Sequence, residues 1–167
     1  MPRAADYAIQ GFLYQFNKTI LEILKAQDDD TVTVEGIVED IEVASPVLLT
    51  AIQCKYHEAS TSFTPSSVYK PLLQMLKHFS DCPTAKIRYV LFAHFPSVST
   101  PLPIVDKTTL QAALASEDKE LKKHIRAVPP DVDLDGFVAC FAMEFGPSYD
   151  EIAKAVSKEL ESNGLPE

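Results

Sequence analysis

The sequence predicts a single α/β domain in which helices flank a mixed central sheet. Helical spacing of apolar residues and strand-like alternation follow one another along the chain. One nearly continuous apolar run, at 87–95, is typical of a strand that is buried on both faces. The 167 residues are enough for one ordinary domain with its own hydrophobic core.

The first half of the chain predicts the order helix, three strands, helix and strand. Apolar residues recur at helical intervals over 6–27 and again over 68–79. Between these helices, the segments 31–35, 37–43 and 48–55 alternate or are rich in apolar residues, as strands are. The polar stretch at 58–67 is expected to be a loop. With the run at 87–95, the order is αβββαβ.

Helical additions are expected beyond this core. The segment 108–126 predicts one or two helices, and 137–145 is strand-like or mixed. A final helix is expected over 148–161, because Ser148 and Glu151 have the spacing of a capping box. There is no internal repeat, so 1–167 is interpreted as one domain, which would also suit the N-terminal module of a longer protein.

Composition favours a reduced, cytoplasmic protein that does not span a membrane. No apolar run approaches the roughly 20 residues that cross a bilayer, and the first residues lack the apolar stretch of a secretory signal. The three cysteines are scattered, with no Cys or His spacing suited to zinc. The acidic run at 131–136 lacks the closing Glu of a calcium loop and is expected to be a solvated turn.

The net charge of −9 counts against a nucleic-acid-binding domain, because such domains usually carry a basic surface that contacts phosphates. Two explanations stay open if the chain does act on DNA. Part of the acidity would bind Mg²⁺, or the DNA would be held mainly by another part of a longer protein or by a dimer.

Three polar residues are expected to share one face of a β-hairpin. A turn at 44–47 would pair Val43 with Leu48 and place Asp40 opposite Ala51. Because side chains alternate along a strand, Gln53 and Lys55 would then point the same way as Asp40. A change of one residue in the turn would move Asp40 to the other face.

This trio has the chemistry of a metal-dependent hydrolase. The Asp40 carboxylate and the Gln53 amide oxygen are hard ligands suited to Mg²⁺ or Mn²⁺. Lys55 could stabilise charge on an attacked phosphate or position the water nucleophile, which together with a metal covers the needs of phosphodiester hydrolysis.

Several acidic residues are candidates for a further metal ligand. Glu35 and Glu42 are close in sequence to Asp40, and Glu42 is expected to share its face. Glu39 is expected to point away from Asp40 in a regular strand, and Glu22 on the first helix is a fourth candidate.

A longer pattern of residues carries a resemblance to a known family. It consists of Gly11-Phe12-Leu13-Tyr14-Gln15 on the opening helix, then Val34-Glu35, Glu39-Asp40-Ile41 and Ile52-Gln53-Cys54-Lys55-Tyr56-His57. This pattern resembles the Q-x-K branch of the PD-(D/E)XK nucleases. It is most similar to the N-terminal double-stranded DNA endonuclease modules of bacterial anti-phage effectors, and Mrr-type restriction enzymes share the Gln variant.

The resemblance implies a restriction-endonuclease-like αβββαβ core and a Mg²⁺-dependent endonuclease that cuts double-stranded DNA. It further implies a bacterial, cytoplasmic protein that is often fused to a C-terminal sensor domain. Assembly into a homo-oligomer is a further possibility that the resemblance leaves open. The catalytic aspartate matches Asp40, the Asp/Glu/Gln position matches Gln53 and the lysine matches Lys55. Gln15 matches a polar helix residue that abuts the site. Unlike many members, this chain has no Pro before Asp40.

Four residues are candidates for contact with DNA: His57, Lys122, Lys123 and Arg126. A solvated surface explains them equally simply. The acidic charge and the Gln ligand also leave a second function open, in which a nuclease fold without activity binds protein or nucleic acid.

Overall fold

The computed structural model describes residues 4–36, 39–57, 62–98 and 105–165, with side chains from residue 7 onward. The first elements are α1 (Ala4–Lys25), β1 (Thr31–Val34), β2 (Ile41–Ala44), β3 (Leu49–Tyr56), the 3₁₀ helix η1 (Pro65–Val68), α2 (Tyr69–Asp81) and β4 (Ile87–His94). The later elements are α3 (Lys107–Leu114), α4 (Lys122–Ala127), α5 (Leu134–Cys140), β5 (Phe141–Phe145) and α6 (Tyr149–Ser162).

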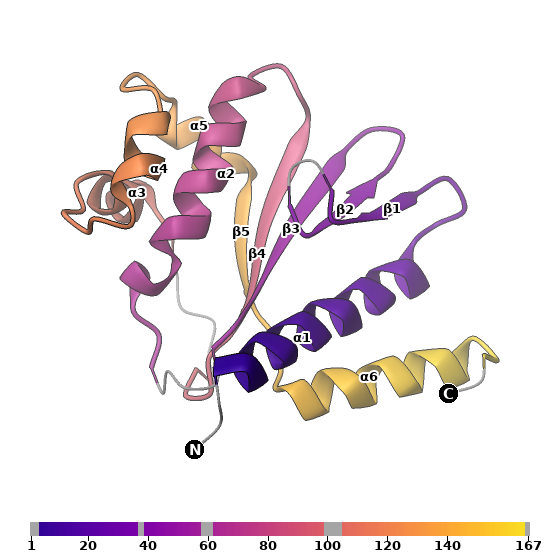
Figure 1. Cartoon of the computed structure of the whole chain (residues 1–167). Coiled ribbons are helices and arrows are strands. Elements are labelled where there is room, and N and C mark those ends of the chain that lie inside the picture. The colour runs from indigo at the N-terminus through magenta and orange to yellow at the C-terminus, as the bar shows by residue number, and fades with distance from the viewer. Residues whose placement is uncertain (1–3, 37–38, 58–61, 99–104, 166–167) are drawn as a thin grey trace.

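The strands form one open, mixed, five-stranded sheet in the order β1-β2-β3-β4-β5. β1, β2 and β3 pair antiparallel, whereas β3, β4 and β5 are parallel. α1 and α6 lie side by side on one face of the sheet, and α2, α3, α4 and α5 gather on the other (Figure 1). The expected α/β class, with a mixed sheet flanked by helices, is therefore confirmed.

β4 separates two hydrophobic cores. Its residues Tyr89, Leu91 and Ala93 face the core under α2, while Val90 and Phe92 face the core under α1 and α6. All five are at most 7% exposed, so the prediction of a strand buried on both faces at 87–95 is confirmed. Full burial of a side chain of this size stabilises the fold by about 2 kcal/mol, which makes β4 the central support of the sheet.

The β2–β3 hairpin has a different register from the expected one. Val43 pairs with Thr50 rather than Leu48, and Ala51 pairs with Glu42 rather than Asp40. Ser45 sets this register, because its backbone N–H donates to the Leu48 carbonyl at 2.9 Å. The Ser45 hydroxyl also accepts from the Leu48 N–H at 3.1 Å. The turn therefore spans residues 45–48 rather than the expected 44–47, so each strand is shifted by one residue.

The shift of two residues in pairing keeps the alternation of side chains. Ile41 pairs with Ile52, so continuing the register by one residue places Asp40 opposite Gln53 rather than Ala51. Asp40 itself precedes β2, which is shorter than the strand expected over 37–43. Residues 37 and 38 of that prediction lie outside the described part of the chain. β1 ends before Glu35, whose backbone has φ 52°, in the left-handed region.

The segment over 137–145, which was expected to be strand-like or mixed, is mixed. Residues 137–140 complete α5, and the strand β5 begins at Phe141. Asp133 begins this helix, since its carboxylate accepts from the Gly136 N–H at 2.9 Å. The acidic run at 131–136 is thus partly a helix start and not only a solvated turn.

The other helix predictions hold within the described residues. α3 and α4 fall inside the expected 108–126 segment apart from the first residue of α3 and the last residue of α4, and part of the loop expected over 58–67 forms η1. Ser148 caps α6 in a complete capping box with Glu151.

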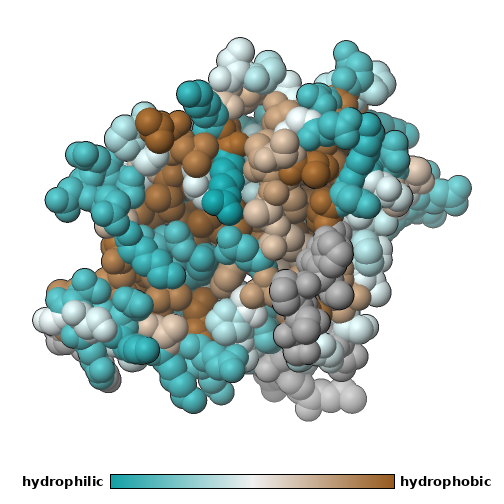
Figure 2. Space-filling model, turned by 180° about the vertical axis from the view of Figure 1, so that it is seen from behind, coloured by the Kyte–Doolittle hydropathy of each residue, from teal (hydrophilic) through white to brown (hydrophobic). Residues whose placement is uncertain are grey.

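Within the described residues, no helix combines the length and the apolar character needed to cross a bilayer. The back of the molecule shows hydrophobic side chains that reach the surface among hydrophilic ones (Figure 2).

Candidate active site

Asp40 is held at the point where the β2–β3 ladder ends. Its backbone carbonyl accepts from the Glu35 N–H at 2.9 Å. Its carboxylate Oδ2 accepts from the Cys54 backbone N–H, also at 2.9 Å. The carboxylate therefore binds β3 through one of its two oxygens, where the next strand residue would otherwise pair.

Gln53 lies directly beyond this contact on β3. Its side chain is 8% exposed, and its Oε1 is buried with no hydrogen-bond partner among the described residues. It has the parity of Ala51, which lies in the core under α2, so it points to that face of the sheet. A buried polar atom without a partner costs about 1–3 kcal/mol. This oxygen is therefore well suited to a bound cation or donor.

Lys55 follows two residues later and points to the same face. Its positive charge lowers the pKa of Asp40 and that of Glu39, so its ammonium group lies within electrostatic range of both carboxylates. Gln53 and Lys55 thus share one face of β3, as the alternation of side chains predicted, and Asp40 lies at the same end of the hairpin through its hydrogen bond from the Cys54 N–H.

Glu39 belongs to this cluster, although it was expected to face away from Asp40. It is 8% exposed. Burial, and then the charge of Asp40, raise the pKa of Glu39 to about 8. Burial also raises the pKa of Asp40, against the opposing effects of the Cys54 N–H and Lys55. Burial and the charge of Asp40 thus oppose the ionisation of Glu39, and a bound cation would favour its ionised form.

Alternation could not identify Glu39, because the chain before Ile41 is not a regular strand. The only sequence signal for it is the pair of adjacent acids, Glu39-Asp40, at the start of an apolar strand.

Gln15 and Glu35 connect α1 to the cluster. The Gln15 Nε2 donates to Glu35 Oε1 at 3.1 Å, and the charge of Glu35 acts on Asp40 to raise its pKa. Gln15 on α1 thus contacts Glu35, which is one of the candidate accessory residues. The left-handed backbone of Glu35 costs about 1 kcal/mol for a residue other than Gly or Asn, and such strain is concentrated at functional sites.

The other two acidic candidates differ in position. Glu42 pairs with Ala51 and therefore shares the face of the trio, and its side chain lies against Gly36, where a Cβ atom would come within 2.3 Å of it. Glu22 binds Lys18 at 2.6 Å on the side of α1 that faces the other core. Glu22 is consequently engaged away from the trio.

His57 packs into the core and does not project as a free phosphate ligand. Its ring stacks on Phe95, with 4.5 Å between the ring centroids, and its Nε2 is buried without a hydrogen-bond partner among the described residues. Burial, and then the charge of Lys55, lower the pKa of His57. The neutral imidazole is therefore favoured.

The basic residues of α4 lie on the far side of α2 from the sheet. Lys122, Lys123 and Arg126 are exposed, and α4 packs on α2. Burial, and then the charges of Lys123 and Lys70, lower the pKa of His124. Because Lys70 is in the first turn of α2, its effect on His124 indicates that α4 adjoins that turn. That turn is at the end of the sheet where β3 and Lys55 finish (Figure 1). No described hydrogen bond or ion pair joins these basic residues to the trio.

No known family model, curated protein or solved structure matches the chain.

The donor set of the cluster fits a hard divalent cation. The described residues include no group of three or more His, Cys, Asp or Glu side chains that could hold a metal ion. Asp40 and Gln53 instead offer one carboxylate and one amide oxygen, a set that leaves several coordination positions to water or substrate. Mg²⁺ usually binds proteins in this way, through one or two carboxylates with several waters retained.

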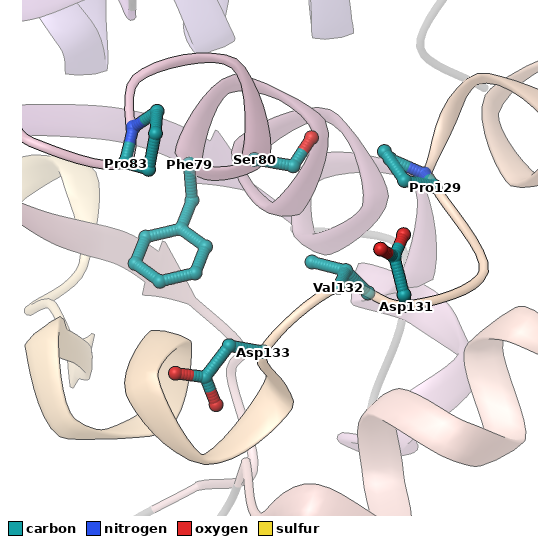
Figure 3. Close-up of a pocket in the computed structure, with 7 residues that line it drawn as sticks. All are labelled: Phe79, Ser80, Pro83, Pro129, Asp131, Val132 and Asp133. Atoms are coloured by element: carbon teal, nitrogen blue, oxygen red, sulfur yellow. The ribbon is translucent and has the colours of Figure 1, made fainter.

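A separate pocket of about 270 Å³ lies away from the trio, where α2 meets the loop before α5. In Figure 3, Phe79 and Ser80 come from α2, and Val132 and Asp133 face them from the loop. Asp133 is occupied as the helix cap of α5. None of the candidate site residues lines this pocket.

Proposed function

We propose that the protein is a metal-dependent DNA endonuclease whose active site is formed by Asp40, Gln53 and Lys55. The observation that supports this most is the buried, unpartnered Oε1 of Gln53 next to a carboxylate fixed by the Cys54 N–H. An oxygen ligand prepared in this way, beside a lysine, suits phosphodiester hydrolysis better than a purely structural role.

Each residue has a distinct part in this proposal. Asp40 Oδ1 and Gln53 Oε1 would hold Mg²⁺ or Mn²⁺, and the cation when bound would supply water activation and charge neutralisation. Lys55 would donate to the attacked phosphate and offset the negative charge that develops on it. Gln15 would keep Glu35 beside Asp40 through the 3.1 Å hydrogen bond, as a positioning residue.

The substrate and setting come from the resemblance of the motif Asp40…Gln53-x-Lys55 and of the αβββαβ order to PD-(D/E)XK nucleases. On that basis we propose double-stranded DNA as the substrate and a restriction-endonuclease-like core as the fold. The protein would be a cytoplasmic, bacterial anti-phage effector domain, with a C-terminal sensor domain in a longer chain.

The test is conversion of supercoiled plasmid to the nicked and linear forms with Mg²⁺ or Mn²⁺. Asp40→Asn retains an oxygen for the Cys54 N–H but removes the negative charge, and Lys55→Met removes the ammonium group. Each should lower the rate at least about 100-fold. Matched controls, Glu144→Gln and Lys86→Met, replace exposed residues outside the cluster and should retain wild-type rates.

Equal nicking by the wild type, Asp40→Asn and Lys55→Met would reveal a contaminating nuclease and contradict the proposal. Absence of nicking by the wild type in both metals would favour the second candidate, a nuclease-fold module that binds protein or nucleic acid without cutting. The net charge of −9 supports that candidate, since it opposes approach to DNA.

A further inference from the structure

α1 has two apolar faces, although a helix on the surface of a domain normally has one. Its inner face carries Tyr14 and Leu21, which are buried against the sheet and α6. Its outer face carries Ile9, Phe12, Leu13, Phe16 and Ile23, which are all at least 38% exposed. We call these five residues the outer stripe.

Four of the five residues of the outer stripe lie close to one line along the helix, and Leu13 lies at its edge. At 100° per residue, Ile9, Phe12, Phe16 and Ile23 fall within about 60° of one another. α1 packs on α6, β3 and β1 through other sides of the helix, and the outer side is turned away from both α6 and the sheet (Figure 1). Within the described residues, nothing covers it.

The stripe contains no charge. Between residues 7 and 24 the charged residues of α1 are Lys18 and Glu22. They bind each other at 2.6 Å and are largely buried, with side chains 10% and 19% exposed. An uncharged surface with two phenylalanines, on a chain with a net charge of −9, has the composition of an interface core.

Three residues of the stripe are symmetric about Phe16, since Ile9 and Ile23 lie seven residues before and after it. An antiparallel copy of the same helix, related by a twofold axis through Phe16, would pair each residue i with residue 32 − i. Such self-complementarity is what an isologous dimer interface requires. In this pairing, Phe12 would face Ile20, which packs partly against the inner core, and Leu13 would face Thr19, which is 3% exposed.

The exposed area is large enough for this role. With about 200 Å² for a whole side chain of this size and about half of it exposed, the five residues present about 500 Å² of apolar surface. Two copies would together bury about 1,000 Å² from the stripe alone, which is the lower limit for a specific interface before any polar rim is counted.

We infer that the outer stripe of α1 is a homodimer interface, in which two copies of this chain pack α1 against α1 antiparallel about a twofold axis through Phe16. The inference is independent of the proposed nuclease activity, because its test measures mass and cross-linking.

The first test is sedimentation equilibrium of the full chain at about 1–100 μM, a range that covers ordinary specific association. The wild type should have twice the mass of the chain, and Phe16→Glu should shift the dissociation constant at least about 100-fold towards monomer. Val47→Glu is the matched control, because Val47 is 75% exposed in the β2–β3 turn, and it should remain dimeric.

The second test is mild oxidation of single-cysteine additions, which does not depend on whether Phe16→Glu folds. Phe16→Cys should give a covalent dimer in high yield, because residue 16 lies on the axis. Phe12→Cys should give little, since its two copies would be about 12 Å apart along the helices, beyond the reach of a disulfide. A mixture of Ile9→Cys and Ile23→Cys should cross-link, and each alone should not. The wild type, with its own three cysteines, is the background.

A monomeric wild type over the whole concentration range of about 1–100 μM would overturn the inference. The stripe would then be a contact surface for another partner. A dimer that persists in a folded Phe16→Glu variant, or equal cross-linking at residues 12 and 16, would also overturn it.

Discussion

At the scale of single residues, Gln53 is the clearest conflict between stability and function in this molecule. Its Oε1 is buried and has no partner among the described residues, although the surrounding sheet is otherwise apolar and well packed. Natural chains retain such atoms where a ligand satisfies them. The conflict predicts that stability and activity respond to substitution of Gln53 in opposite directions.

Gln53→Met has nearly the same volume and removes the unsatisfied amide. In the absence of metal, the free energy of unfolding should rise by about 1 kcal/mol, as measured by urea denaturation with EDTA present. Plasmid nicking should be lost in the same variant. Gln74→Met on the exposed side of α2 is the control and should change neither quantity. A loss of stability in Gln53→Met would mean that the amide is a satisfied structural group.

Glu39 gives a prediction for pH dependence. Burial and Asp40 raise the pKa of Glu39 to about 8 from its ordinary 4.5. The folded protein therefore holds this proton more tightly than the unfolded chain does. Its contribution to stability is complete below pH 4.5 and is lost progressively as the pH rises to 8.

Glu39→Gln cannot ionise and should escape this loss. With EDTA present, its free energy of unfolding should equal that of the wild type near pH 5 and exceed it by up to about 3 kcal/mol at pH 9. Glu117→Gln, at an exposed position, should follow the wild type at every pH. Parallel curves for Glu39→Gln and the wild type would show that Glu39 is solvated.

At the scale of elements, α6 begins with a capping box whose worth can be measured. The Glu151 carboxylate accepts from the Ser148 N–H at 2.8 Å, and the Ser148 Oγ accepts from the Glu151 N–H at 3.4 Å. Ser148→Ala should lower the free energy of unfolding by about 1 kcal/mol, and Ser162→Ala in the last turn by much less. Equal effects in a denaturation series would contradict the assigned cap.

The elements also show which features the sequence could predict. Alternation placed Gln53 and Lys55 on one face of β3, and that relation holds because a shift of two residues in the hairpin preserves the parity of the paired residues. The register itself could not be predicted, since it depends on the Ser45 hydroxyl and backbone closing the turn at Leu48. Local hydrogen bonds of this kind leave no periodic signal in the sequence.

Two further features could not be predicted from the spacing of apolar residues, for related reasons. Asp133 begins α5 through a side-chain hydrogen bond, and in the sequence it is one of several similar acids in a turn-rich segment. Glu39 joins the candidate site because the chain leaves the strand geometry just before Ile41. The buried strand β4 and the capping box of α6 are periodic or local properties and were predictable, whereas a site assembled at an irregular strand end was not.

At the scale of the whole molecule, the net charge of −9 means that the proposed DNA binding would depend on cations and on the few basic surfaces. With Ca²⁺ in place of Mg²⁺, we expect duplex DNA to bind and to be released by EDTA. The triple variant Lys122→Gln, Lys123→Gln, Arg126→Gln should weaken this binding at least about tenfold and reduce its salt dependence.

The control for that experiment lies on the opposite face of the sheet. Lys154→Gln with Lys158→Gln alters exposed residues of α6 and should leave the affinity unchanged in a fluorescence anisotropy titration. Equal weakening by both sets would indicate a general charge effect and would remove α4 from the DNA-binding surface.

The most direct test of the candidate site is the anomalous scattering of Mn²⁺ in crystals of the protein. The proposal predicts one strong peak at about 2.1 Å from both Asp40 Oδ1 and Gln53 Oε1, which disappears in Asp40→Asn. Peaks confined to other carboxylates, with none between Asp40 and Gln53 at millimolar Mn²⁺, would contradict the assignment of these residues as a metal-dependent active site.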